Sequence, residues 1–241
     1  MVGTEKTMII VIQQPEHLPW LGFFNKMASA DEFIYLDNVQ FKKRYFENRN
    51  KIRTSTRDNW AWITVPVITK GLQKQEIKEV KIDYEQQWQR KYLNALRHNY
   101  SQAGFFDEIF QELEKIIRTD YTMLVEFNIA LIDFIRDYLG IEAPARRASE
   151  ICPGKGSGLI LSLCIMRKAD VYLSGPDGRN YLAVEEFKKN NIEIKYHDYE
   201  HPVYEQMHKP FISHMSTLDL LFNRGRKSLS IIKEREYIYG R

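Results

Sequence analysis

Cysteine is scarce in this sequence, which limits the chemistry that thiols can supply. Cys152 and Cys164 are the only two among 241 residues. Two cysteines neither define a disulfide framework nor provide a metal site, and a reduced, cytoplasmic setting is therefore expected. The six histidines show no metal-ligand spacing, so no metal site is predicted.

Long apolar runs are also absent. The first seven residues are mostly polar, and the apolar run that begins at Met8 ends before Gln13. This run is too short for the hydrophobic region of a signal peptide. No later run reaches the length of a membrane-spanning helix, so we expect no membrane span.

Neither charge sign dominates. The 35 Lys and Arg residues against 32 Asp and Glu residues leave a net charge of +3. A domain that binds a nucleic acid duplex normally has a more basic balance, so we predict no such partner. A local site for a small anionic ligand remains compatible with this charge.

The order of apolar segments predicts an α/β fold. Residues 8–12 form a continuous apolar run, typical of a strand that is covered on both faces. A short helical pattern over 18–30 and a second strand over 32–36 complete a β-helix-β unit, which implies a right-handed parallel crossover. Strands over 171–173 and 192–196, with a helix between them, predict a second unit of the same kind.

The middle of the chain predicts two additions to this sheet. Residues 60–67 and 77–82 alternate between apolar and polar positions, which predicts two strands paired as a hairpin-like β excursion over 60–82. The period then becomes helical over 84–140, which predicts a helical layer. We therefore expect one domain over 1–241, with a mainly parallel central sheet, a β excursion and a helical layer.

Polar side chains follow the predicted strands directly and mark a candidate ligand site. Ligands of open α/β sheets bind at the carboxyl ends of strands, so the turn at 13–20 and the loop at 174–181 are predicted to form one pocket for a small anion. The segment 41–53 interleaves basic and aromatic residues, which suit phosphate or carboxylate binding and ring stacking, although a solvated basic turn has the same pattern. The predicted substrate-binding residues are Gln14, Trp20, Gln40, Lys43, Arg44, Asn48, Arg49, Ser174, Gly175, Arg179 and Tyr181.

Two residues are candidates for catalysis. His17 lies at a strand-to-helix turn, where anions are attracted, and an ordinary imidazole pKa of about 6.5 suits removal of a proton from an amine. A single histidine is more often structural. Asp37 follows the second predicted strand and is expected to orient an acceptor together with Gln14 and Gln40.

Several motifs occur in an order that resembles one protein family. They are QQPxxLPWLG at 13–22, DxVQFxKR at 37–44, NRxxI at 48–52, YLSG at 172–175, HPxY at 201–204 and LDLLFN at 218–223. Together they resemble the WbqC-like family. The resemblance implies a family core over 8–226 and leaves 227–241 as a peripheral tail.

The resemblance also carries an expectation about function. Members occur in bacterial gene clusters for O-antigen and other surface polysaccharides, and a role as a glycine transferase is suggested for them. It implies a transferase that moves an aminoacyl or acyl group onto a nucleotide-activated sugar or glycan precursor. Two alternatives stay open: an adenylate-forming or nucleotidyl-transfer enzyme on a Rossmann-like scaffold, and a non-catalytic protein that binds a glycan intermediate. No cofactor can be named from the residues.

Overall fold

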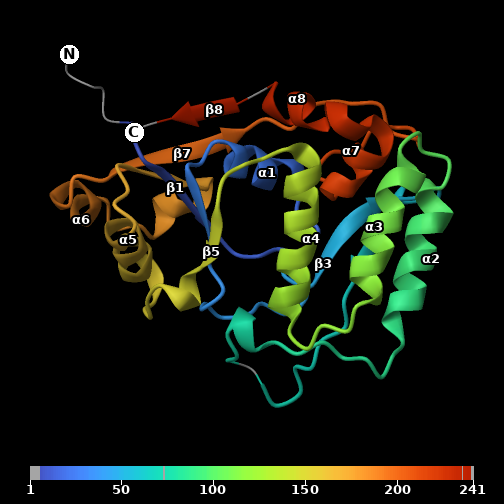
Figure 1. Ribbon diagram of the computed structural model, residues 1–241, viewed down its shortest axis with the longest axis horizontal. Helices are drawn as coiled ribbons and strands as arrows, with labels where there is room; N and C mark the ends of the chain where they lie inside the picture. Colours follow the sequence, from blue (N-terminus) through green and yellow to red (C-terminus); the bar gives the residue numbers. More distant parts are fainter. Residues whose placement is uncertain (1–5, 73, 235, 240–241) are drawn as a thin grey trace.

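A six-stranded sheet forms the centre of the computed structural model, which describes residues 6–72, 74–234 and 236–239 (Figure 1). Its strands are β1 (Ile9–Gln13), β2 (Glu32–Tyr35), β5 (Ala145–Arg147), β6 (Val171–Ser174), β7 (Glu193–Tyr199) and β8 (Glu236–Tyr239). The strand order is β5-β2-β1-β6-β7-β8. The first five strands are parallel and β8 runs antiparallel to β7. The predicted α/β class with a mainly parallel sheet is confirmed.

The central strands are apolar at successive positions because both faces of the sheet are covered. On β1, Val11 belongs to one core cluster, whereas its neighbours Ile10 and Ile12 belong to another. On β2, Phe33 packs with the first cluster and Ile34 with the second. Successive side chains of a strand point to opposite faces, so this continuous apolar run is what a two-sided core requires.

Helices cover both faces of the sheet. They are α1 (Leu21–Ala28), α2 (Trp88–Tyr100), α3 (Phe106–Arg118), α4 (Leu124–Leu139), α5 (Gly156–Met166), α6 (Val184–Lys189), α7 (Thr217–Arg224) and α8 (Ser228–Lys233), with the 3-10 turns η1 (Ile77–Glu79), η2 (Ala148–Glu150), η3 (Pro176–Asn180) and η4 (Gly225–Lys227). Figure 1 shows α5 and α6 at one end of the molecule and α2, α3 and α4 gathered as a layer at the other. Within the described part of the chain, no helix has both the length and the apolar composition needed to cross a membrane.

The β excursion is paired differently from the prediction. The hairpin consists of β3 (Arg49–Arg53) and β4 (Trp60–Thr64), and residues 77–82 contribute the turn η1 and isolated bridges instead of a partner strand. The pairing predicted between 60–67 and 77–82 is present at the antiparallel bridge between Val67 and Ile82, whereas β4 itself pairs with β3. The strand β3 was not visible in the sequence because its buried face includes the polar Asn50, whose amide nitrogen donates to the carbonyl groups of His17 and Leu18.

The end of the chain is part of the folded structure. Residues 227–241, predicted to be a peripheral tail, include α8 and the edge strand β8 within their described part. Ile232 of α8 is fully buried, and its carbonyl oxygen accepts a hydrogen bond of 2.8 Å from the Asn25 side chain. This hydrogen bond ties α8 to α1.

Candidate functional site

A cavity of about 440 Å³ opens at the carboxyl ends of β1, β6 and β7. In the sheet, β2 is the neighbour of β1 on one edge and β6 is its neighbour on the other edge. The strand order therefore changes direction at β1. Ligands of open α/β sheets bind at such switch points, and the volume lies within the range of roughly 300–1,000 Å³ typical of small-molecule sites. We call it the switch-point cavity. It is lined by Gln13, Gln14, Glu16, Trp20, Lys26, Lys42, Tyr45, Gly175, Asp177, Tyr181, His197, Asp198 and Tyr199, with further apolar and loop residues.

Lys26 is a buried cation in the wall of the switch-point cavity. It lies in the last turn of α1 and is only 6% exposed. Its ammonium group has neither a hydrogen bond nor an ion pair among the described residues. Burial lowers the pKa of Lys26 to about 8, although the nearby Glu16 charge opposes this shift. A buried lysine without a hydrogen-bonded partner is costly to the fold, so Lys26 marks the switch-point cavity as a candidate ligand site.

Glu16 supplies the opposite charge to the same cavity. It lies half-buried in the loop between β1 and α1, and its Oε1 accepts a hydrogen bond of 3.3 Å from Gln13 Nε2. Burial raises the pKa of Glu16 to about 7, and the Glu47 carboxyl group adds to the shift, whereas Gln13 and Lys26 counteract it. A carboxyl group with such a pKa can accept or give a proton near neutral pH.

His197 lies in the cavity wall as a neutral imidazole. The Asn25 amide nitrogen donates to the Ile232 carbonyl oxygen, so the Asn25 oxygen accepts from His197 Nε2, at 2.6 Å. This chain of bonds fixes the ring proton on Nε2. Burial, together with the smaller effect of the Lys26 charge, lowers the pKa of His197 to about 4. His197 therefore stays neutral next to the charged Lys26.

Two more polar groups of the cavity are buried without a partner. The oxygen Oε1 of Gln13 and the hydroxyl group of Tyr199 form no hydrogen bond within the part of the chain that the structure describes. Buried polar atoms are satisfied in most folded proteins. With Lys26, they form a set of groups that a bound polar molecule would complete.

A family model matches residues 14–231, nearly the whole chain. The chain belongs to the WbqC-like protein family. One relative of this WbqC-like protein is "Uncharacterized protein Rv1507c" of Mycobacterium tuberculosis (strain ATCC 25618 / H37Rv), which is 37% identical over 223 residues, covering 91% of this chain and 95% of the relative. No solved structure matches the chain.

The structure brings four of the predicted binding residues of this WbqC-like protein together. Gln14 and Trp20 of the first loop line the switch-point cavity together with Gly175 and Tyr181 of the loop after β6. The two loops that the sequence analysis paired thus meet across one cavity. Its charged lining is mixed, however, because Lys26 and Lys42 face Glu16, Asp177 and Asp198.

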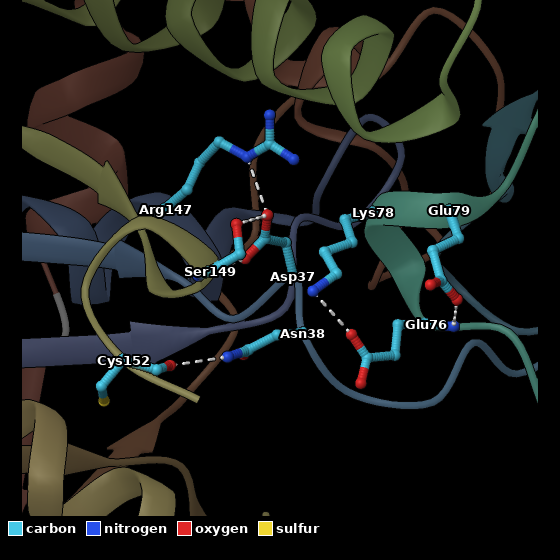
Figure 2. A network of polar contacts seen from close by, with 8 residues as sticks. All are labelled: Asp37, Asn38, Glu76, Lys78, Glu79, Arg147, Ser149 and Cys152. Carbon is cyan, nitrogen blue, oxygen red and sulfur yellow. Dashed lines mark hydrogen bonds and ion pairs between the residues drawn. The ribbon is translucent and has the colours of Figure 1, made fainter. Parts of the chain in front are cut away.

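Asp37 lies at the centre of a buried polar network beyond the end of β2 (Figure 2). Its carboxylate is fully buried and accepts hydrogen bonds from Arg147 Nε at 2.7 Å and from both the backbone nitrogen and the hydroxyl group of Ser149, at 2.9 and 2.7 Å. These bonds tie the end of β2 to the last residue of β5 and to η2. Asp37 is not among the residues that line the switch-point cavity.

The same network extends to the segment that carries η1. Figure 2 shows Lys78 paired with Glu76 at 2.9 Å, and Asn38 donating to the Cys152 carbonyl oxygen at 3.1 Å. The predicted binding residue Gln40 forms an isolated antiparallel bridge with Glu76. Gln40 therefore lies on the η1 side of the network.

His17 is held in the core between the first loop and two helices. It is fully buried, with Nδ1 2.9 Å from Asn128 Oδ1 and Nε2 2.8 Å from the Tyr92 hydroxyl group. The Asn128 nitrogen donates to backbone carbonyl groups of Pro15 and Glu47, so its oxygen accepts from His17 Nδ1. Burial lowers the pKa of His17 to about 4. Its hydrogen bonds fasten the Glu16-bearing loop to α2 and α4.

Four predicted residues of the basic segment 41–53 lie outside the switch-point cavity, although Lys42 and Tyr45 of this segment line it. Lys43 and Arg44 are exposed, and the Arg49 guanidinium lies 4.0 Å from the centre of the Trp62 ring. Asn48 donates to the Val65 carbonyl oxygen at 2.9 Å. None of these four predicted residues lines the switch-point cavity, and their role in anion binding stays a prediction.

The remaining predicted residues lie in the loop after β6. Ser174 is buried and donates to the Gly175 carbonyl oxygen at 3.0 Å. Gly178 allows this packing, because a Cβ at that position would lie 2.1 Å from Ser174 Oγ. Arg179 stacks over the Tyr196 ring at 4.1 Å. Ser174 and Arg179 therefore support the loop from outside the lining of the cavity.

The sequence analysis missed Glu16, Lys26 and His197. A signal for Lys26 was present: in α1 every residue from 21 to 27 is buried, and Asn25 and Lys26 are the polar exceptions. A charged residue is rarely fully buried without a reason. Glu16 had no comparable signal, because its raised pKa depends on which segments of the folded chain bury it.

Proposed function

We propose that this protein is a transferase that moves an aminoacyl or acyl group onto an amine or hydroxyl group of a nucleotide-activated sugar or a related glycan precursor. The observation that carries this proposal is Lys26, a buried ammonium group in the switch-point cavity that forms no hydrogen bond or ion pair with the described residues. Groups with strongly displaced pKa values gather at functional sites, and Lys26 shares its cavity with Glu16.

The two groups divide the chemistry of acyl transfer between them. Glu16, with a pKa of about 7, accepts the proton of the attacking amine or hydroxyl group as its nitrogen or oxygen bonds to the acyl carbon. Lys26 remains protonated at neutral pH and lies where it can stabilise the negative charge that develops on the acyl oxygen. The bond from the acyl carbon to its leaving group then breaks, and the leaving group departs with its electron pair.

The rest of the cavity can position the acceptor. Gln13 Oε1 and the Tyr199 hydroxyl group are free to bind hydroxyl or amino groups. The Trp20 indole offers an apolar surface beside them, held over Gly22, where a Cβ would lie 2.5 Å from the ring. A polar ring compound with amino or hydroxyl substituents satisfies this combination.

Nucleotidyl transfer is the second candidate, and the topology favours it. The cavity lies at the switch point between β1 and β6, where nucleotides bind in Rossmann-like folds. On this alternative, Lys26 would hold a phosphate group. Release of pyrophosphate during turnover would separate it from acyl transfer.

The experiment is a thermal-shift panel at neutral pH with nucleotide-sugars, ATP, acyl-CoA and amino acids, because a ligand that binds only the folded protein raises its melting temperature. The panel is run on the wild type, on Lys26→Met and on the control Lys70→Met, which removes an exposed lysine. We expect a ligand that stabilises the wild type and the control but not Lys26→Met, and transfer activity with that ligand that Glu16→Gln abolishes.

Three other results would count against the proposal. If the ligand raised the melting temperature of Lys26→Met as much as that of the wild type, Lys26 would not be part of the binding site. Pyrophosphate release with ATP would favour nucleotidyl transfer. Binding of a nucleotide-sugar without turnover of any donor would indicate a non-catalytic carrier.

A further inference from the structure

The outer face of the β3–β4 hairpin combines indole rings with cations. Trp60 and Trp62 alternate along β4 with the buried Ile63 and therefore lie on the face away from the core. The Arg49 guanidinium lies 4.0 Å from the centre of the Trp62 ring, and Lys51 Nζ lies 4.6 Å from that of Trp60. Trp62 remains 37% exposed. This face thus offers an exposed indole ring with the Arg49 guanidinium over it and the Lys51 ammonium group nearby.

A groove of about 290 Å³ lies between this hairpin and α2. We call it the hairpin groove; the lining residues that matter here are Trp62, Thr64, Gln86, Trp88, Lys91 and Tyr92. It shares no lining residue with the switch-point cavity among the described residues. It is therefore a separate site, and its occupancy does not depend on the proposed function.

Trp88 brings an unused hydrogen-bond donor to the hairpin groove. Its side chain is 5% exposed, and its indole Nε1 has no hydrogen-bond partner within the described chain. Tyr92, the neighbouring polar aromatic of the wall, already bonds to His17. A buried donor without a partner destabilises the fold, so the Trp88 donor indicates a ligand oxygen at this place.

We propose that the hairpin groove binds a glycan through a six-membered sugar ring that carries a carboxylate, a hexuronate. The Trp62 ring packs against the C–H face of the sugar, and Trp88 Nε1 donates to a ring or hydroxyl oxygen. Lys91 follows Trp88 by three residues, so it lies on the same side of α2 and binds the carboxylate. Gln86 adds an amide group at the start of the helix.

The charges around the hairpin groove select an acidic sugar. Among the described residues that line the hairpin groove, Lys91 carries the charge. Arg49 and Lys51 lie close to the Trp62 ring. A neutral sugar would leave these cations without a counter-charge. A nucleic acid also stacks on aromatic rings, but the net charge of +3 is small for a protein that binds a polyanion.

Isothermal titration calorimetry with three probes tests the inference: an oligogalacturonate, a neutral malto-oligosaccharide and an oligothymidylate. We expect the oligogalacturonate to bind best. Trp62→Ala should weaken its binding at least tenfold, which corresponds to about 1.4 kcal/mol, while Trp62→Phe keeps a ring and most of the affinity. Lys91→Gln should remove the preference for the acidic over the neutral sugar, and Lys70→Gln, at an exposed position outside the groove, should change nothing.

Each other outcome overturns the inference. Preferential binding of the oligothymidylate would make the face a nucleic-acid surface. Binding of no saccharide, or undiminished binding by both Trp62→Ala and Lys91→Gln with unchanged melting temperatures, would show that the hairpin groove is not a sugar site.

Discussion

Glu16 and Lys26 share one cavity, and burial moves their pKa values toward each other, to about 7 for Glu16 and about 8 for Lys26. Each charge favours the ionised form of the other, but burial outweighs that attraction in both. Two groups whose pKa values both lie close to neutral pH are suited to proton transfer. Substitutions at this pair and in the structure that holds it test this arrangement.

Glu16→Gln should stabilise the protein at high pH. A carboxyl group whose pKa is raised on folding contributes stability below its unfolded pKa, here about 4.5, and that stability is lost as the pH rises through about 7. The variant lacks this loss. The difference in free energy of unfolding between the variant and the wild type should therefore grow from near zero at low pH to about 1–3 kcal/mol above neutrality. It stays in this range because the half-exposed carboxyl group keeps part of its hydration. Urea denaturation across this pH range measures it.

A matched control for this prediction is Glu85→Gln, which changes an exposed carboxyl group next to α2. The difference in free energy of unfolding between Glu85→Gln and the wild type should stay constant across the pH range. If Glu16→Gln and the wild type kept a constant difference across the range, the burial of Glu16 would not be as described.

Gly175→Ala should weaken ligand binding without disturbing the fold. Gly175 has ordinary backbone angles of φ −68° and ψ 166°, and an added Cβ would lie 3.6 Å from Lys26 Nζ. The methyl group would thus occupy the space in front of the ammonium group, and affinity for an anionic ligand should fall by about tenfold, or about 1.4 kcal/mol. Titration calorimetry measures the affinity, with Gly104→Ala as control, because no atom lies within 4 Å of its added Cβ. Equal affinity in both variants would place the ligand elsewhere.

Asp37→Ala should destabilise the protein strongly. The carboxylate is buried and bonded to Arg147 and Ser149, and removing one member of a buried pair typically costs about 3–5 kcal/mol. Asp137→Ala removes a carboxylate that pairs with Arg136 at the surface and should cost about 1 kcal/mol or less. Guanidinium denaturation compares the two. A small loss for Asp37→Ala together with a large loss of transfer activity would instead make Asp37 catalytic.

His17→Gln should reduce the sensitivity of the protein to acid. Burial lowers the pKa of His17 to about 4 in the folded protein, so the unfolded chain binds the proton first and stability falls as the pH drops from about 6.5 to about 4. The variant should be less stable at neutral pH, because Tyr92 and Asn128 lose bonds, but its stability should fall less steeply in this window. Thermal unfolding at several pH values follows the slope, and an unchanged slope would contradict a neutral, buried His17.

The sequence was informative where a pattern reflects burial. The strands β1 and β2 could be predicted because a sheet covered on both faces needs apolar residues at successive positions, as in Ile10, Val11 and Ile12. The meeting of the first loop with Gly175 followed from the rule that parallel strands end at one edge. Both are consequences of local composition and chain topology.

The features that the sequence did not reveal depend on long-range packing. The strand β3 could not be predicted as the partner of β4, because its buried Asn50 satisfies its amide group with carbonyl groups more than thirty residues away. Glu16 could not be recognised because its raised pKa arises only when other segments, among them those that carry Lys26 and Glu47, pack around it. Arg49 was grouped with Arg44 by adjacency, whereas strand geometry directs it onto Trp62.

The most direct test of the central claim is a crystal structure of the protein with the ligand that the thermal-shift panel selects. We predict that its anionic or carbonyl group lies within hydrogen-bonding distance of Lys26 Nζ, with a hydroxyl or amino group toward Glu16. Density for the ligand outside the switch-point cavity, with Lys26 still lacking a partner, would contradict this account.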